Sequence, residues 1–196
     1  MIDASYRYQE KSSKKKLPML LIVIVIGAIL GVIAKQGDVA HQGTAAGNLL
    51  YAVGLVTSGF FIWTVACIII SLKSDRAAFA AINVLGFLAS MLLTYYLYSH
   101  YAVGYLVTRV VKFWALALIP SAVLSALVYK AKSNKFLRYV VLIIATLVML
   151  VDILYWQGGV LIAIVIDLIL YAVLLAVVKR LDGEPATGGG AYPGSP

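Results

Sequence analysis

Charged residues are scarce in this sequence of 196 residues: 12% are Asp, Glu, Lys or Arg, whereas 63% are hydrophobic. Soluble domains contain about 25% charged and about 45–50% apolar residues. The mean hydropathy of +0.98 therefore predicts an integral membrane protein. Because each span needs about 20 residues, the chain has room for six spans and none for a separate soluble domain.

Cysteine is limited to Cys67, which excludes an intrachain disulfide and the paired-thiol chemistry of a quinone-linked thiol oxidoreductase. The motifs HExxH and GxSxG and the Walker A phosphate loop are also missing. We therefore expect no enzyme activity, no metal and no cofactor. A net charge of +8 would suggest nucleic acid in a soluble protein. Here the basic residues lie at the ends of apolar segments, where they meet lipid headgroups, so we expect no nucleic-acid partner.

The apolar segments predict an all-α integral membrane protein, a compact bundle of six transmembrane helices. The expected spans are residues 17–34, 48–72, 77–98, 105–129, 136–156 and 160–178. A basic N-terminal segment, residues 1–16, precedes this domain of residues 17–180. Residues 181–196 follow it as a tail that its Gly and Pro content predicts to be disordered.

The distribution of basic residues predicts the orientation of the chain. Thirteen of the 16 Lys and Arg residues fall in the N-terminal segment, the second and fourth loops and the C-terminal end. These segments share one side of a six-span protein. Because cytoplasmic segments carry the excess of Lys and Arg, we expect both termini to be cytoplasmic, in a protein of the cell membrane.

The most unusual residues are two acids inside the last two spans, Asp152 and Asp167. A carboxylate within a bilayer is costly unless it is paired, protonated or hydrated, so it indicates a functional site by default. At a rise of about 1.5 Å per residue, both acids lie roughly 6 to 10 Å from the outer end, level with Arg109 and Lys112 of the preceding span. We expect an outward-facing ligand site or buried charge cluster between spans four, five and six. Its predicted members are Arg109, Lys112, Asp152, Asp167, Tyr105 and Trp156.

A structural interpretation of the same residues stays open. Arg109 and Lys112 can extend to the outer interface, and each acid can be satisfied by groups near it.

Small residues recur on one face of the first span, at Gly27, Gly31 and Ala34. Such a face allows close helix contact, either within the chain or with another chain. A compact six-span protein with cytoplasmic termini, an outer pocket and a small-residue first helix resembles the S-components of energy-coupling factor transporters. The resemblance implies a vitamin-sized solute in the outer pocket and docking of the first helix on a coupling subunit.

Three functions follow from these observations. The first is a small-solute binding or transport component. The second is a non-catalytic accessory or assembly subunit, with a partner subunit or as a homo-oligomer, whose intramembrane charges fix helix packing. The third is an intramembrane enzyme that acts on lipid or isoprenoid substrates through Asp152 and Asp167, although no metal-binding or phosphate-binding pattern accompanies these acids.

Overall fold

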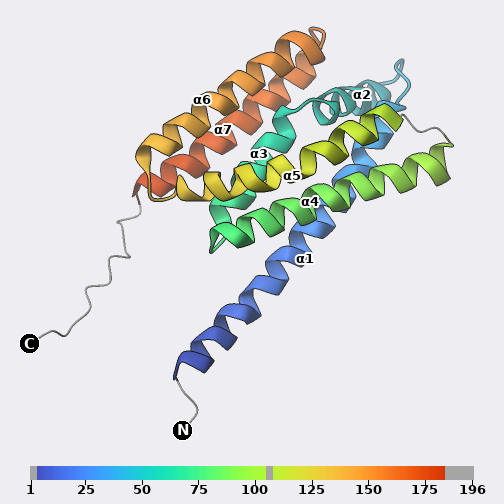
Figure 1. The fold of residues 1–196 in the computed structure, drawn as a ribbon. Helices are drawn as coiled ribbons and strands as arrows, with labels where there is room; N and C mark the ends of the chain where they lie inside the picture. Colours follow the sequence, from blue (N-terminus) through green and yellow to red (C-terminus); the bar gives the residue numbers. More distant parts are fainter. Residues whose placement is uncertain (1–3, 105–107, 184–196) are drawn as a thin grey trace, which may run out of the picture.

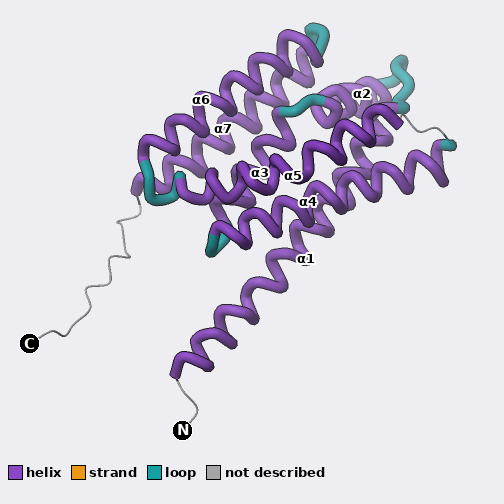
Figure 2. Tube along the Cα trace, viewed as in Figure 1, coloured by secondary structure: helices purple, strands orange, loops and turns teal. Residues whose placement is uncertain are grey.

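The computed structural model describes residues 4–104 and 108–183, and within these ranges all regular secondary structure is helical (Figures 1 and 2). Two of the elements, η1 and η2, are short π-helices that continue α4 and α6. The described elements are α1 (Ala4–Asp38), α2 (Ala45–Ser58), α3 (Phe61–Lys73), α4 (Ala77–Tyr98), η1 (Ser99–Val103), α5 (Thr108–Lys130), α6 (Lys135–Val151), η2 (Asp152–Trp156) and α7 (Leu161–Gly183).

Among the described residues, five helical stretches are each long and apolar enough to cross a membrane. They are Pro18–Asp38, Ala77–Val103, Val111–Lys130, Lys135–Trp156 and Leu161–Leu181. Helices α2 and α3 meet the same condition only together, and they are bent by 63°. The predicted all-α membrane bundle is therefore confirmed, with five helical stretches of spanning length and the bent pair α2 and α3, here called the broken span.

The broken span differs from the continuous helix predicted over residues 48–72. Helix α2 ends at Ser58, Gly59 is extended (φ −74°, ψ 176°), and α3 begins at Phe61. A Ser-Gly dipeptide is a common interruption of helices, and it lies here inside an otherwise apolar run. The 13 residues of α3 measure only about 20 Å, which is shorter than a bilayer core of about 30 Å. Phe61, the first residue of α3, is fully buried, so the N-terminus of this helix lies within the bundle.

Two further sequence expectations concern the ends of elements. Helix α1 continues beyond residue 34 to Asp38, so Lys35 belongs to a helix and not to a loop. The segment from residue 184 onward lies outside the described residues, and its predicted disorder stays a prediction.

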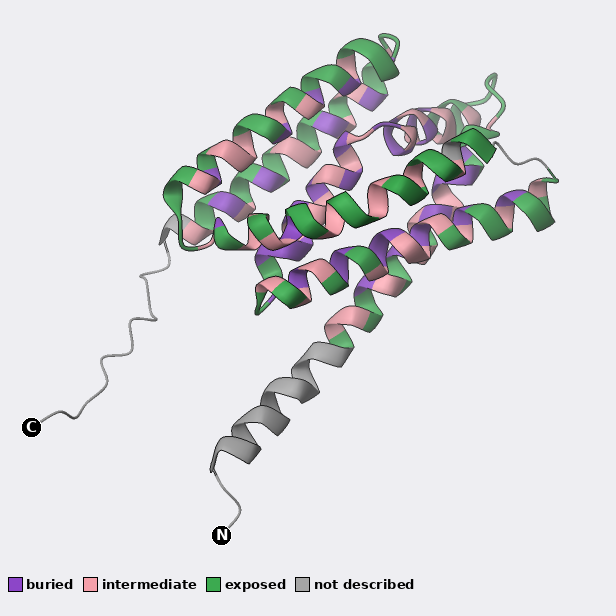
Figure 3. Ribbon diagram, in the orientation of Figure 1, coloured by how far each residue is buried: buried purple, intermediate pink, exposed green. Residues whose placement is uncertain are grey.

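Helix α3 is the centre of the bundle. On one side its Trp63 packs with Phe87 in a cluster formed with α1 and α4. On the other side its Phe61 packs with Leu174 in a cluster formed with α6 and α7. Figure 3 shows the buried residues along the inner faces and exposed residues along the outer faces of α5, α6 and α7. Those outer faces carry large apolar side chains such as Leu116, which is 78% exposed, and they suit contact with lipid.

The small-residue face of α1 packs against α4. A Cβ atom on Gly27 would lie 2.3 Å from the carbonyl oxygen of Phe87, and one on Gly31 would lie 2.3 Å from that of Met91. Ala34, one turn further along, is 4% exposed. The close contact that these small residues allow is therefore made inside the chain. In this structure α4 covers this face, and the docking on a coupling subunit that the S-component resemblance implies stays a prediction.

We expect Gly31→Ala to lower the free energy of unfolding by about 1–3 kcal/mol, because the new methyl group meets the backbone of α4. Alanine by itself favours a helix over glycine by about 0.5–1 kcal/mol, so a loss of stability would come from packing. The measurement is thermal or denaturant unfolding of the purified protein in detergent.

The matched control is Gly86→Ala, where the nearest atom to the new Cβ is the flexible end of Leu20 at 3.0 Å. This variant should be at least as stable as the wild-type protein. Equal stabilities of the two variants would contradict the close α1–α4 contact.

Candidate functional site

Asp152 satisfies the free N-terminus of α3 in the middle of the broken span. Its carboxylate accepts hydrogen bonds from the backbone N–H of Phe60 (2.9 Å) and of Phe61 (2.7 Å). The first turn of any helix has N–H groups without an intrahelical partner, and a carboxylate there is also favoured by the helix dipole. Phe60, the residue that precedes α3, has no side-chain acceptor of its own. The acid that was costly as an isolated charge is thus a helix cap supplied from another span.

Gly59 makes this cap possible because it has no side chain. A Cβ atom at this position would lie 2.3 Å from Oδ2 of Asp152. The carboxylate therefore occupies the space that any other residue at position 59 would fill.

The π-helix η2 starts at Asp152 and ends at Trp156, which is 42% exposed, and the next residue, Gln157, is buried in the interior. The backbone N–H of Gln157 bonds to the carbonyl oxygen of Asp152 (3.1 Å), which closes the wide turn. Gly158 and Gly159 follow with φ of 53° and 82°, a region that glycine adopts without strain. This tight turn leads into α7.

Asp167 of α7 is fully buried, with 0% of its surface exposed. The side-chain amide of Gln157 donates a hydrogen bond from Nε2 to Oδ2 of Asp167. The two carboxylates of Asp152 and Asp167 are close enough to act on one another electrostatically. The hairpin between spans five and six thus gathers one amide and two acids behind the break in span two.

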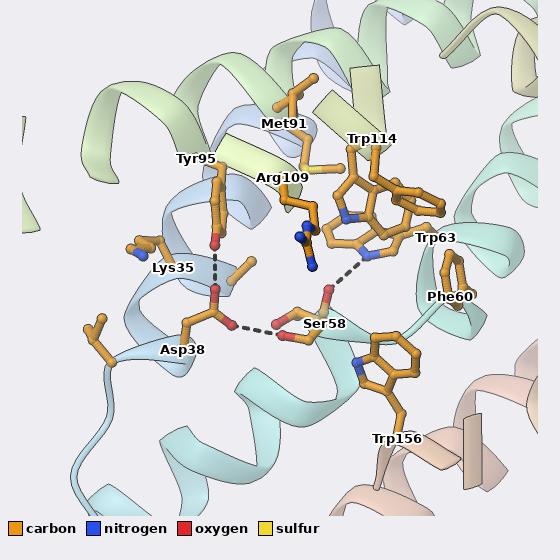
Figure 4. Close-up of a pocket in the computed structure, with 15 residues that line it drawn as sticks. Lys35, Asp38, Ser58, Phe60, Trp63, Met91, Tyr95, Arg109, Trp114 and Trp156 are labelled. Carbon is orange, nitrogen blue, oxygen red and sulfur yellow. Dashed lines mark hydrogen bonds between the residues drawn. The ribbon is translucent and has the colours of Figure 1, made fainter. Parts of the chain in front are cut away.

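A cavity of about 570 Å³ lies beside this break, at the end of the bundle where α1 ends and α7 begins, here called the far end. Figure 4 shows how α1, α4, α5, η2 and the break between α2 and α3 surround it. The residues that line it are Ala34, Lys35, Asp38, Val39, Thr57, Ser58, Phe60, Trp63, Met91, Leu92, Tyr95, Arg109, Phe113, Trp114 and Trp156.

One side of the cavity is held by hydrogen bonds to Asp38. Its carboxylate accepts a hydrogen bond from Tyr95 Oη (2.6 Å) and another from Ser58 Oγ (2.8 Å). Lys35, which is 2% exposed, lies with Nζ 5.3 Å from the centre of the Tyr95 ring. These contacts join the ends of α1, α2 and α4 and fix the polar rim of the cavity.

Aromatic rings form the opposite wall, with Phe60 at their centre. The ring of Phe60 lies 5.7 Å from that of Phe113 and 5.4 Å from those of Trp114 and Trp156, measured between centroids. Trp63 continues the wall, 6.3 Å from Trp114. Such a wall offers flat apolar faces to a ligand.

Arg109 projects from the start of α5 into the cavity, toward Ser58 (Figure 4). In the part of the chain that the structure describes, no hydrogen bond or ion pair engages its guanidinium group. A guanidinium group presents several N–H donors in a plane, which suits a carboxylate or a phosphate. The cavity therefore combines one available cation with an aromatic surface.

The structure divides the predicted charge cluster into separate groups. Arg109 and Trp156 line the same cavity, whereas Asp152 and Asp167 lie behind its wall and bond to the backbone of α3 and to Gln157. Lys112 is exposed and does not line the cavity. Among the described residues no ion pair joins either acid to either cation.

The sixth residue of the predicted cluster, Tyr105, lies outside the described residues. Sequence reasoning did not select Lys35, Asp38, Ser58 or Phe60, which line the cavity. The Ser58-Gly59 dipeptide within an apolar segment indicates a break in the helix, and this signal could have identified Ser58 and the adjacent Phe60.

No protein-family model, no curated protein and no solved structure matches the chain. The fold and the cavity define a small polytopic membrane protein with a broken span beside an aromatic cavity. The resemblance to S-components consequently rests on architecture alone.

We expect Asp152→Asn to lower the free energy of unfolding by about 1–3 kcal/mol. An amide has only one oxygen acceptor, so one N–H at the start of α3 would face the NH₂ group and stay unsatisfied. Unfolding of the purified protein, followed by tryptophan emission or circular dichroism, measures the change.

Asp75→Asn is the control for this change, because the Asp75 side chain is exposed in the turn before α4. It should leave stability within about 0.5 kcal/mol of the wild type. If Asp152→Asn also leaves the free energy of unfolding unchanged, the hydrogen bonds from Asp152 to the start of α3 do not stabilise the structure.

A double-mutant cycle tests whether the predicted acid–base network exists. Lys112→Met and Asp167→Asn should have effects on stability that add within about 0.5 kcal/mol, because the two side chains share no contact. A larger coupling energy would restore the single charge cluster that the sequence suggested.

Proposed function

We propose that the chain binds a small solute in the cavity at the far end and releases it unchanged, as a binding or transport component of the cell membrane. The observation that carries the proposal is the guanidinium group of Arg109, which points into a cavity of about 570 Å³ without a bonded partner among the described residues. Ligand cavities of proteins have volumes of about 300–1,000 Å³, mostly apolar walls and few polar groups. This cavity fits each of these criteria.

The lining favours a solute with a flat apolar body and one anionic group. The rings around Phe60 and Trp114 offer the apolar surface, and Arg109 offers the donors. Lys35 and Arg109 are cations, whereas Asp38 is the one anion of the lining. Asp38 already accepts two hydrogen bonds, so it completes the wall and leaves the anion-binding role to Arg109.

The orientation of the cavity follows from charge. Helix α1 begins and α7 ends at the same end of the bundle, where the turns after α3 and α5 also lie (Figure 1). Thirteen of the 16 basic residues belong to the segments at this end. The positive-inside rule supports a cytoplasmic location of that end and of both termini. The cavity then faces outward.

The alternative function, a non-catalytic accessory or assembly subunit, is favoured by a different observation. Asp152 and Asp167 have partners inside the chain, so their presence in the membrane does not require a ligand. This role does not explain an arginine that projects into an aromatic cavity. Solute binding therefore accounts for more of the structure.

The experiment is a thermal-shift series with aromatic carboxylates of increasing size, from benzoate to anthracene carboxylate, and with the corresponding carboxamides. A ligand that binds only the folded protein stabilises it by about 2.7 kcal/mol at a concentration 100 times its Kd. We expect the carboxylates to raise the unfolding temperature more than the carboxamides, since only they pair with Arg109.

Two variants make this test specific. Arg109→Gln should abolish the difference between carboxylates and carboxamides, whereas Lys112→Gln, three residues further along the same helix and outside the cavity, should preserve it. The same response in both variants would locate any binding elsewhere. The absence of stabilisation by every compound of the series would favour the accessory-subunit function.

A further inference from the structure

A second polar site lies behind the aromatic wall, between η2 and α7. Gln157 is 1% exposed and Asp167 is 0% exposed, and the amide of Gln157 donates to Oδ2 of Asp167. Within the described part of the chain, Oδ1 of Asp167 and Oε1 of Gln157 are buried and have no hydrogen-bond partner. Both are acceptor oxygens. The site therefore lacks a donor or a cation, not another acceptor.

The charge of Asp152 acts on this site. Its carboxylate accepts hydrogen bonds from two backbone N–H groups at the start of α3, and such bonds favour the ionised form of a carboxyl group. A second ionised carboxylate at Asp167 would repel it in an apolar interior. The repulsion between two carboxyl groups that share such a site is removed when one of them is protonated.

Among the side chains that the structure describes, no ion pair with a basic residue offsets this repulsion. Helix α7 packs against α2, α3 and α6, and no ion pair reaches Asp167 from the described residues. Tyr171 of α7 bonds to Thr146 (2.7 Å), and the Lys and Arg residues of these helices belong to the opposite, basic end of the bundle. The other titratable groups with described side chains on these helices and on η2 are Tyr51, Cys67, Lys73, Lys135, Arg138, Tyr139, Asp152, Tyr155, Tyr171, Lys179 and Arg180.

The number of open oxygens distinguishes a proton from a metal ion. Ca²⁺ and Mg²⁺ require about six or more oxygen ligands, whereas this site has two acceptor atoms without a partner. One proton needs only the bond to one oxygen and a hydrogen bond to a second. The two open atoms, one on a carboxyl group and one on an amide, match that requirement.

We propose that Asp167 and Gln157 form a proton-binding site behind the cavity. A proton from bulk water bonds to Oδ1 of Asp167, removes the negative charge beside Asp152, and provides the donor that the carbonyl oxygen of Gln157 lacks. Release of the proton returns it to water and restores the repulsion between the acids. Because Gln157 follows Trp156, which lines the cavity, release also displaces the Trp156 side of the wall. This link to the cavity, unlike the proton site itself, rests on the proposed function.

Infrared difference spectroscopy of the full chain in lipid nanodiscs tests the site directly. A protonated carboxylic acid has a carbonyl stretching band that a carboxylate lacks. We expect this band in the wild-type protein at neutral pH, its reversible loss as the pH rises, and its absence in Asp167→Asn. The band should persist in Asp152→Asn, which removes the other acid. A missing band in the wild type, or a band that Asp167→Asn leaves unchanged, would overturn the proposal.

Stability provides an independent measurement, because Asn has the shape and the neutral charge of a protonated Asp. Asp167→Asn should fold and should change the unfolding temperature by less than about 3 °C at neutral pH, whereas Asp152→Asn should lower it further. An Asp167→Asn variant that fails to fold, or that loses more stability than Asp152→Asn, would show that Asp167 acts as a charged carboxylate.

The coupling to the cavity has its own readout. Tryptophan emission should change with pH together with the infrared band in the wild type and stay constant in Asp167→Asn. If the tryptophan emission does not change over the pH range in which the infrared band is lost, the coupling to the cavity is contradicted and the proton site is not. Failure of the carboxylate series above would contradict the proposed solute and the role of the coupling in binding it, but it would leave the infrared and stability results for the proton site unaffected.

Discussion

The hydrogen bonds from the start of α3 to Asp152 are the interaction on which the remaining structure depends. Inside a bilayer an interrupted helix is tolerated only where protein or water satisfies the free backbone groups. Asp152 does this for Phe60 and Phe61, and Gly59 leaves the necessary space. The cap therefore permits the 63° bend between α2 and α3.

The bend in turn creates the cavity. Helix α3 belongs to both apolar clusters, one with α1 and α4 and the other with α6 and α7, so its position relates the two halves of the bundle. Where α2 turns away from α3, Phe60 and Ser58 become lining residues. Discontinuous helices near binding sites are a feature of secondary transporters, in which a free helix N-terminus faces the substrate. In this chain the N-terminus faces an internal carboxylate, and Arg109 offers the positive charge to the cavity instead.

The sequence predicted the fold class and most spans, because long apolar runs have few alternatives to membrane helices. It also identified Asp152, Asp167, Arg109 and Trp156 as unusual, since polar groups in such runs require a partner. It did not predict which partners they have. Residues 60 and 152 lie far apart in the chain, and their contact depends on a bend that hydropathy does not reveal. A backbone N–H is present at nearly every residue, so sequence alone cannot identify the one that a carboxylate will cap.

The separation of 91 residues between Phe61 and Asp152 has a consequence for synthesis in the membrane. At about 5–20 residues per second, the ribosome completes the cap roughly 5–20 s after α3 has begun to emerge. During that interval the break in span two has no carboxylate, and its N–H groups must be satisfied by water or by the insertion machinery. The second span therefore cannot reach its final place in lipid until the fifth span arrives.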